Sequence, residues 1–524
     1  MWRVILLVLV GVASSSSAMG EQATVVERWG MFEVAVSNSK AYANPFTDVA
    51  LEGTFTSPSG KQIEVSGFYD GGQTWRLRFM PDEIGEWRYE AKFTDGSPGS
   101  AGTFMCIAGK LRGPLRVRKD NPLWFEHADG APFYLRSFLL WCIDALDEKT
   151  LADTLDWLKA QGFNTIDGPH LLFGKPHSGR PRGHADDDGS GRLPWRRNAD
   201  GSIDFAAFNL TVWQNLDRAL RKLEERGMVI LPFSVLGGTN GLPKPPTKEL
   251  QDLLLRYWVA RWGGFWNATY QPVSEWWEGY SEKEMQEIGR TIKELDGGRH
   301  LISVHSIDTG VCNHSLQRAD WYSYHTVQDK LENWNPTKYT WFVDLHRRFA
   351  KPIGSQECFW EGNRYQKEAG LDMDNMRRGA WVTALCGGQI SYADEVVLPR
   401  QCERGEEGVF SGLGLAIKPR GLFYPYLKTL GDFIESLPFW RMTPQPKLSN
   451  TGICLAEVGH EYVIYSPNGG VITLDLTSAK GSFVGRWLNP RTGKFSKPLE
   501  VKSGGRRAFT APDGDDWALE VKRR

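Results

Sequence analysis

The sequence of 524 residues has almost no net charge, because its 62 basic and 63 acidic residues leave a formal balance of −1. A protein that binds nucleic acid needs an excess of basic surface, so we expect no nucleic-acid partner. Beyond the N-terminal segment there is also no apolar run near the roughly 20 residues that a membrane helix requires. The sequence therefore predicts no membrane span.

Cysteines are few and widely spaced. The seven cysteines are odd in number and none forms a C-x-x-C pair, which disfavours a zinc ribbon or a thioredoxin-like site. Cys106, Cys142 and Cys454 lie in apolar, strand-like runs, where a buried thiol acts as a small hydrophobic residue. The loop at 184–189 is rich in oxygen ligands but lacks the ligand spacing of an EF-hand. We expect no metal site and no cofactor.

A motif that would indicate a serine hydrolase is also missing. No Gly-x-Ser-x-Gly turn is present, which disfavours a Ser-His-Asp enzyme. Aromatic residues, in contrast, are abundant, with 22 Trp, 16 Tyr and 26 Phe. Such rings fill hydrophobic cores or offer flat apolar surfaces to sugar rings, and composition alone leaves both readings open.

The N-terminal segment has the pattern of an export signal. A basic start at Arg3 precedes an apolar run over 4–13 and small residues over 14–18. This order is typical of a signal peptide, and we expect cleavage near Ala18. The run is too short to span a membrane, and no cysteine follows it to carry a lipid. We therefore expect residues 1–18 to be removed and the protein to be exported, to the periplasm or outside the cell.

Two regions have the period-two alternation of β-strands. Residues 24–110 contain alternating runs at 49–55 and 75–79, separated by Pro/Gly-rich turns. Residues 443–524 show the same pattern, for example at 462–465. Strands at this spacing predict an immunoglobulin-like β-sandwich at the N-terminus and a second β-sandwich at the C-terminus.

Residues 111–438 alternate strand-like and helix-like segments. We expect strands near 133–142, 164–173, 228–236, 268–274, 300–306, 321–326, 352–356 and 389–392. Helical patterns lie between or after them at 147–161, 205–226, 248–262, 282–295, 337–350, 374–385 and 423–437. About eight strand-helix units without a Gly-x-Gly-x-x-Gly opening favour a central (β/α)8 TIM barrel over an open sheet. The fold class predicted is therefore multidomain, with all three domains packed together.

Two glutamates directly follow strands of this predicted barrel. Glu275 follows the fourth strand and precedes Trp276, while Glu357 follows the seventh strand and stands close to Trp360. In a (β/α)8 barrel the active site lies at the carboxyl ends of the strands, so both side chains face the same opening. Glycoside hydrolysis requires two carboxyl groups that flank one bond. The pair therefore indicates catalysis on a sugar.

Other polar and aromatic residues also end strands. Tyr392 and Asp394, after strand eight, are further candidates of this kind. We expect a carbohydrate substrate to contact residues at the strand ends, namely Trp141, His170, Ser274, Trp276, His305, Tyr324, His325 and Trp360.

The flanking domains carry recognisable motifs. The segments 44–49, 67–71 and 78–87 resemble the immunoglobulin-like module called domain of unknown function 5060, which stands at the front of secreted glycoside hydrolases. The segment 486–493 is similar to a C-terminal sandwich often named a collagen-binding domain. That name does not by itself assign a function to the C-terminal sandwich.

The central region resembles clan A glycoside hydrolases, most nearly the apiosidase-like group (domain of unknown function 4038). The resemblance rests on 257–267 ahead of strand four and on Lys351-Pro352, which opens the strand leading to Glu357. It implies that Glu275 is the acid/base and Glu357 the nucleophile of a retaining enzyme that uses double displacement. It also implies that a Tyr or His of strand six orients Glu357. The substrate expected is a plant or algal polysaccharide or oligosaccharide.

The sequence departs from this group at one position. Clan A enzymes commonly have Asn before the acid/base, whereas this chain has Ser274, which is shorter. A non-catalytic carbohydrate-binding protein and a polysaccharide lyase, with Arg364 facing a uronate, remain alternatives. The sugar, the linkage, exo or endo action, disulfide pairing and the oligomeric state stay open.

Overall fold

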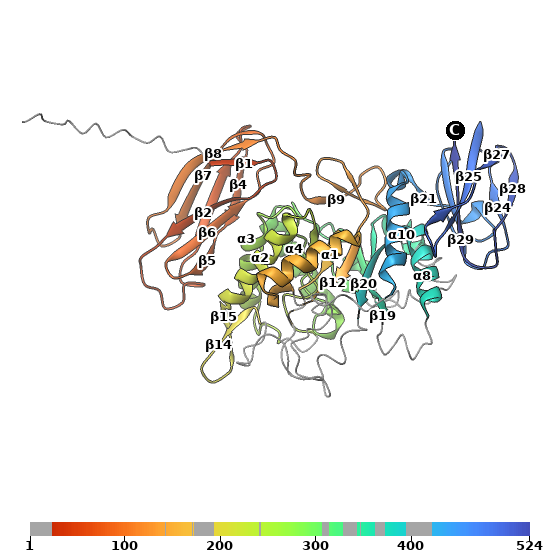
Figure 1. The fold of residues 1–524 in the computed structure, drawn as a ribbon. Coiled ribbons are helices and arrows are strands. Elements are labelled where there is room, and N and C mark those ends of the chain that lie inside the picture. The colour runs from red at the N-terminus through yellow and green to blue at the C-terminus, as the bar shows by residue number, and fades with distance from the viewer. Residues whose placement is uncertain are drawn as a thin grey trace, which may run out of the picture.

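The computed structural model describes residues 24–141, 143–169, 171, 193–239, 243–306, 314–328, 343–345, 347–361, 372–394 and 422–524. Figure 1 shows a β-sandwich at each end of the molecule and a central domain of helices and strands between them. Within the described ranges, no helix is long and apolar enough to cross a membrane.

The N-terminal domain is a sandwich of two sheets. One sheet has the order β1-β8-β7-β3-β4 and the other the order β2-β6-β5. Alternate side chains point inward and form a core that includes Phe55, Trp87 and Cys106, whose thiol is free and buried. The strands are β1 Thr24–Glu27, β2 Phe32–Ser37, β3 Leu51–Thr56, β4 Gln62–Ser66, β5 Phe68–Gly71, β6 Thr74–Phe79, β7 Gly85–Phe93 and β8 Ser100–Ile107.

The central domain contains one parallel sheet of seven strands in the order β16-β13-β12-β20-β19-β18-β17. Each neighbouring pair is parallel, as the alternation of strands and helices predicts. The strands are β12 Arg136–Leu139, β13 Thr165–Asp167, β16 Val229–Leu231, β17 His305–Ser306, β18 His325–Val327, β19 Ile353–Glu361 and β20 Gly388–Asp394.

The segment expected as the fourth strand, 268–274, lies between the two edge strands of this sheet, β16 and β17. On one side, Ile230 donates a backbone hydrogen bond to Asn267. On the other side, Tyr270 forms a parallel bridge with Ile302. The segment thus connects β16 with the chain just ahead of β17.

Helices follow most of the strands and pack against the sheet. A capping box opens α4, because the side chains of Ser281 and Glu284 each accept a hydrogen bond from the other residue's backbone N–H group. The interior combines large apolar side chains of helices and strands into one core. The helices with full bounds are α1 Glu148–Ala160, α2 Leu210–Glu224, α3 Lys248–Trp262, α4 Glu282–Asp296, α5 His314–Arg318, α8 Met373–Leu385 and α10 Tyr424–Glu435.

One predicted helix begins later than the sequence suggests. Residues 205–208 belong to β15 (Ile203–Phe208), which forms an antiparallel hairpin with β14 (Trp195–Arg197). The ring of Phe205 packs edge-on against Trp195 at 4.8 Å, which holds the segment in the hairpin. The helix begins only after Asn209, whose side chain accepts a hydrogen bond from the N–H of Val212.

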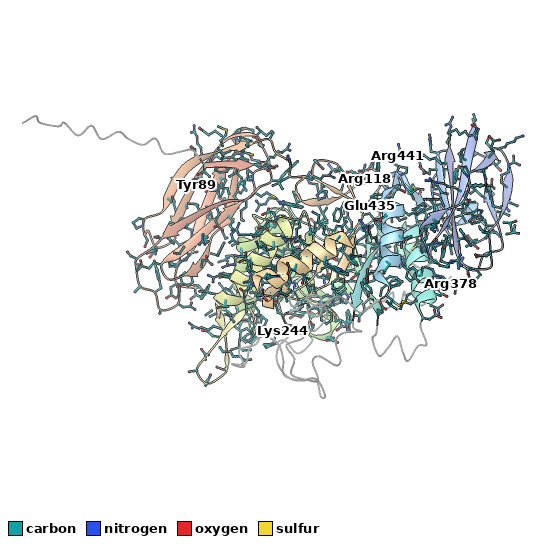
Figure 2. The ribbon with its side chains drawn as sticks, in the orientation of Figure 1. Tyr89, Arg118, Lys244, Arg378, Glu435 and Arg441 are labelled. Carbon is teal, nitrogen blue, oxygen red and sulfur yellow. The ribbon has the colours of Figure 1, made fainter. Side chains whose placement is uncertain are left out.

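A small antiparallel sheet of β9 (Leu115–Val117), β10 (Phe125–His127) and β11 (Pro132–Phe133) packs under the amino ends of the parallel strands. Arg118, which follows β9, therefore marks the amino-end side, and Lys244, which follows β16, marks the carboxyl-end side. Figure 2 shows Arg118 and Lys244 at opposite edges of the central domain. The strands therefore run from the edge near Arg118 to the edge near Lys244.

The C-terminal domain is a second sandwich. Its larger sheet has the order β21-β22-β23-β29-β25-β26, with β27 also paired to β25, and its smaller sheet pairs β24 with β28. Cys454 is a free thiol in its core, as predicted, whereas Cys142 lies outside the described residues. The strands are β21 Thr443–Pro444, β22 Cys454–Glu457, β23 Glu461–Ser466, β24 Val471–Asp475, β25 Ser482–Asn489, β26 Lys494–Phe495, β27 Leu499–Lys502, β28 Arg506–Thr510 and β29 Trp517–Arg523.

Buried ion pairs attach both sandwiches to the central domain. On the N-terminal side, Asp217 of α2 contacts Arg78 of β6 at 2.9 Å and also pairs with the fully buried Arg261 of α3. On the C-terminal side, Arg377 of α8 forms two hydrogen bonds with Asp516, at 2.6 and 3.0 Å. The three domains therefore pack together, as expected from the sequence.

Candidate active site

Glu275 stands where the fourth parallel segment ends. Its backbone adopts the left-handed conformation, with φ 46° and ψ 48°. Among the described residues, only Trp29, Glu275 and Ala350 have a positive φ without being glycine. This conformation costs a non-glycine residue about 1 kcal/mol or more, and such strain concentrates at functional sites. The sharp turn ends the strand and redirects the chain at the predicted acid/base.

Neighbouring loops hold this turn from both sides. The hydroxyl of Thr239, in the loop after β16, donates a 2.8 Å hydrogen bond to the carbonyl of the fully buried Ser274. Lys244 donates to the carbonyl of Gly279 at 2.9 Å. A Cβ on Gly279 would lie 1.9 Å from the carbonyl oxygen of Gly238, so only glycine permits this approach. The loops after strands three and four are therefore fixed against each other beside Glu275.

The two tryptophans after Glu275 differ in exposure. Trp276 belongs to the core and exposes only 6% of its surface, while Trp277 is half-buried. Their rings meet edge to face, with centroids 6.4 Å apart. Trp277, which the sequence reasoning passed over, therefore has more free surface for a ligand than the predicted Trp276.

Three aromatic rings form a row across the carboxyl ends of strands one, three and five. Trp141 packs on Phe233 and Phe233 packs on His305, each with centroids 5.0 Å apart. His305 is fully buried, and burial lowers the pKa of its imidazole to about 3. The ring is therefore neutral at ordinary pH. The structure thus brings the predicted residues Trp141 and His305 together through Phe233, which the sequence analysis did not select.

A layer of polar side chains lies within the parallel strands. Asp167 of β13 is fully buried and accepts 2.6 Å hydrogen bonds from the hydroxyls of Ser137 and Ser391. It also accepts a 2.9 Å hydrogen bond from the side-chain amide of Gln356. Burial raises the pKa of the Asp167 carboxyl to about 6. This carboxyl joins four strands, because Ser137, Ser391 and Gln356 lie on β12, β20 and β19.

Strand seven is longer and less regular than predicted. β19 continues to Glu361, and its pairing with β20 shifts between Ser355 and Phe359. Three residues of β19, 356–358, lie opposite a single residue of β20, Ser391, which defines a bulge. Gln356 and Glu357 lie within it, so Glu357 is part of the irregular strand and does not follow its end. The side chains of Glu357 and Trp360 lie outside the described residues.

The last residue of β19 is a second glutamate, and it has structural partners. Glu361 accepts hydrogen bonds from the Tyr392 hydroxyl at 2.7 Å and from the backbone N–H groups of Leu422 and Phe423 at 2.7 and 2.9 Å. These last two precede α10, so Glu361 satisfies donors at the start of that helix. Tyr392 is engaged in the same contact. Both carboxyl oxygens of Glu361 are thus engaged in contacts that hold the fold, which argues against a catalytic role for Glu361.

The two predicted residues of strand six lie away from the strand ends. Tyr324 points to the inside of the sheet near its amino end and packs on Phe125 of β10, with ring centroids 5.4 Å apart. His325 has the opposite direction and packs between Tyr322 and Phe349. Neither placement favours contact with a substrate at the carboxyl ends. His170 and Arg364 lie outside the described residues, as does the side chain of Asp394.

Comparison with known families covers all three domains. Residues 119–393 match the family described as "Apiosidase-like, catalytic domain", which is more than half of the 524 residues. Residues 25–94 match domain of unknown function DUF5060. Residues 447–522 match the family described as "Putative collagen-binding domain of a collagenase". These matches confirm the resemblance stated from the sequence.

Solved structures share the fold at low sequence identity. One, described as "a putative glycoside hydrolase" from Bacteroides vulgatus ATCC 8482, is similar over 96% of this chain and 100% of that chain, with 20% identity and a TM-score of 0.78. Another, a glycoside hydrolase family 5 protein from the same organism, is similar over 79% and 93%, with 15% identity and a TM-score of 0.58. No curated protein matches.

The central domain, with its polar layer and strained glutamate at a strand end, is that of a glycosidase. The chain belongs to the apiosidase-like family, by a match over more than half of its length.

Proposed function

We propose that this glycosidase works with retention, with Glu275 as acid/base and Glu357 as nucleophile. The observation that carries the proposal is the left-handed backbone of Glu275 at the end of the fourth parallel segment. A strained, half-buried carboxyl residue at this place lowers the stability of the fold. A catalytic role would account for its presence there. Family membership supports the same reading.

The proposal includes a closed (β/α)8 barrel. The segment 268–274 supplies the missing strand between β16 and β17. Ile230 donates a backbone hydrogen bond to Asn267, just ahead of the segment, and on the other side Tyr270 donates to Leu301 and accepts from Ser303. Closure places strands four and seven across one opening. The two carboxyl groups then lie roughly 5–5.5 Å apart when a substrate is bound, the separation of retaining enzymes.

In the first step the Glu357 carboxylate attacks the anomeric carbon, while Glu275 gives its proton to the departing oxygen. The glycosidic bond breaks and a glycosyl-enzyme ester forms. In the second step Glu275, now a carboxylate, takes a proton from water. The resulting hydroxide attacks the anomeric carbon, the ester bond breaks, and Glu357 returns to its charged form.

The substrate we propose is a plant or algal polysaccharide or oligosaccharide. Trp141, Phe233 and His305 provide a row of rings at the strand ends, and Trp277 adds a half-buried face next to Glu275. His170, Ser274, Trp276 and Trp360 remain predicted contacts. We also keep export after cleavage near Ala18 as part of the proposal, since a polymer substrate lies outside the cell.

The test is incubation of the mature protein with a panel of plant and algal polysaccharides, including apiose-bearing oligosaccharides because of the family's description. NMR spectra of the first sugar released should show the same anomeric configuration as the bond that was cut. The inverted configuration would reject retention. An unsaturated uronate product would favour the lyase, and tight binding without any product would favour the carbohydrate-binding protein.

A further inference from the structure

Asp167 was not a candidate from the sequence, and its carboxyl group is fully buried in the parallel sheet. Asp167 is the last residue of the buried strand β13, and its carboxyl group accepts hydrogen bonds from three other strands, β12, β19 and β20. Two hydroxyls occupy one carboxyl oxygen, Oδ2, and the side-chain amide of Gln356 occupies the other, Oδ1. Burial of a carboxyl group lowers the stability of the fold unless hydrogen bonds compensate. Three such bonds on one group fix its position and indicate a specific role.

Gln356 connects this carboxyl group to the proposed nucleophile. It directly precedes Glu357, and both lie in the bulge of β19, where regular pairing with β20 is interrupted. The bulged backbone has lost part of its ladder, so its geometry depends on other contacts. One such contact is the hydrogen bond from the Gln356 side chain to Asp167.

We propose that Asp167 is a positioning residue, which holds Gln356 and thereby fixes the bulge that presents Glu357 to the substrate. The inference rests on the proposed function, because it assigns to Asp167 the support of that nucleophile. It adds a residue from strand two to the machinery at strand seven. The reacting geometry must be held within a fraction of an ångström, and loss of such support lowers the rate while substrate binding persists.

The groups around Asp167 restrict what else it could do. Ser137, Ser391 and Gln356 contact it directly, and Tyr324 is the titratable group that senses its charge. Burial raises the pKa of Tyr324, so that phenol remains protonated. The imidazole of His305 is neutral because burial lowers its pKa. Among the described residues, the hydrogen-bond donors to Asp167 are three neutral side chains, and its carboxyl group is fully buried, which favours a supporting role for Asp167.

The experiment compares four variants after purification and a check of folding by circular dichroism. Asp167→Ala removes all three hydrogen bonds. Asp167→Asn keeps the shape and leaves an acceptor for Gln356. Gln356→Met removes only the amide donor. Thr165→Val is the matched control, because Thr165 lies two residues earlier on the same face of β13, is equally buried, and donates its hydrogen bond to Asn164.

The first readout is the rate constant with which an activated 2-deoxy-2-fluoro glycoside labels the nucleophile. Mass spectrometry counts the sites that become labelled, and the rate is expressed per such site. This rate depends on how Glu357 is placed and not on the fraction of protein that folds. We expect Asp167→Ala and Gln356→Met to lower it about 10- to 100-fold. The second readout is steady-state turnover, where kcat should fall equally and KM should change less than about twofold.

Rescue by the conservative variant separates positioning from general damage. Asp167→Asn should recover to within about threefold of wild type, and Thr165→Val should trap at the wild-type rate. A wild-type trapping rate in both Asp167→Ala and Gln356→Met would overturn the inference, as would an equal loss in Thr165→Val. If Asp167→Ala does not fold, Gln356→Met alone decides. If Glu357→Gln is still labelled by the fluoro glycoside, the proposed function itself is rejected. That result is distinct from the two outcomes that overturn the role of Asp167.

Discussion

The side-chain amide of Gln356 donates a 2.9 Å hydrogen bond to Oδ1 of Asp167, across 189 residues of sequence. The contact joins strand two to the bulge of strand seven inside the parallel sheet. It places a buried acid in contact with Gln356, which directly precedes the residue proposed as nucleophile. Both the chemistry and the pH dependence of stability therefore involve Asp167.

Asp167 should make the protein less stable as the pH rises. Its pKa is raised to about 6 in the folded state by burial, against an ordinary value near 4 when unfolded, so the folded protein binds the extra proton. The favourable contribution is complete below about pH 4 and is lost as the pH rises through 6. At about 1.4 kcal/mol per unit, this amounts to about 3 kcal/mol.

The measurement is urea unfolding of wild type and Asp167→Asn between pH 4 and pH 7.5. The difference in unfolding free energy between them should change by about 3 kcal/mol in this interval, with wild type losing stability relative to Asn. A constant difference would show that the carboxyl group titrates normally.

Relief of strain at Glu275 should stabilise the protein while it destroys activity. Glycine adopts the left-handed conformation without a Cβ penalty, whereas alanine keeps that penalty. We expect Glu275→Gly to be about 1 kcal/mol more stable than Glu275→Ala, measured by denaturant unfolding. Both should lack normal turnover. Equal stability of the two variants would mean that the turn is not strained in solution.

The ion pairs between the N-terminal sandwich and the central domain should be sensitive to loss of one partner. Asp217→Ala leaves the buried guanidinium groups of Arg78 and Arg261 without their shared carboxylate. Removal of one partner of a buried pair costs about 3–5 kcal/mol. We expect a loss of this size in thermal or urea unfolding. Lys149→Ala, at the exposed pair with Asp153, is the control and should cause no measurable change.

His305 should not titrate at ordinary pH. Burial lowers its pKa to about 3, so its imidazole remains neutral from pH 4.5 to pH 9. NMR of protein labelled only in histidine should therefore contain one ring whose shifts are constant over that interval and disappear from the spectrum of His305→Gln. Titration of this ring near pH 6.5 would mean that it is open to solvent.

Local signals in the sequence predicted much of the central domain. The helix expected at 248–262 has these same bounds, and the capping box at Ser281 and Glu284 marks the start of α4. Both depend on residues close in sequence, which is why they can be predicted from periodicity and capping. The strand at 205–208 could not be predicted in this way. It pairs with β14 and packs on Trp195, and these contacts override the helical periodicity of its sequence.

The candidate site was predicted only where a strand end reveals it. Glu275 follows a recognisable strand, and its position was found without the fold. The directions of Tyr324 and His325 depend on a strand register that cannot be set from one sequence. Asp167 is the last residue of the short strand β13, and its partners come from β12, β19 and β20, so only the assembled sheet brings them together.

The most direct test of the proposed double displacement uses Glu275→Gln with a nitrophenyl glycoside. This leaving group needs little protonation, so the first step should be largely preserved, while the glycosyl-enzyme accumulates because water is no longer activated. Azide needs no general base, so it should speed turnover several-fold and yield a glycosyl azide of retained configuration. Glu357→Gln should show no turnover with or without azide. Unchanged cleavage rates in both variants would contradict the account.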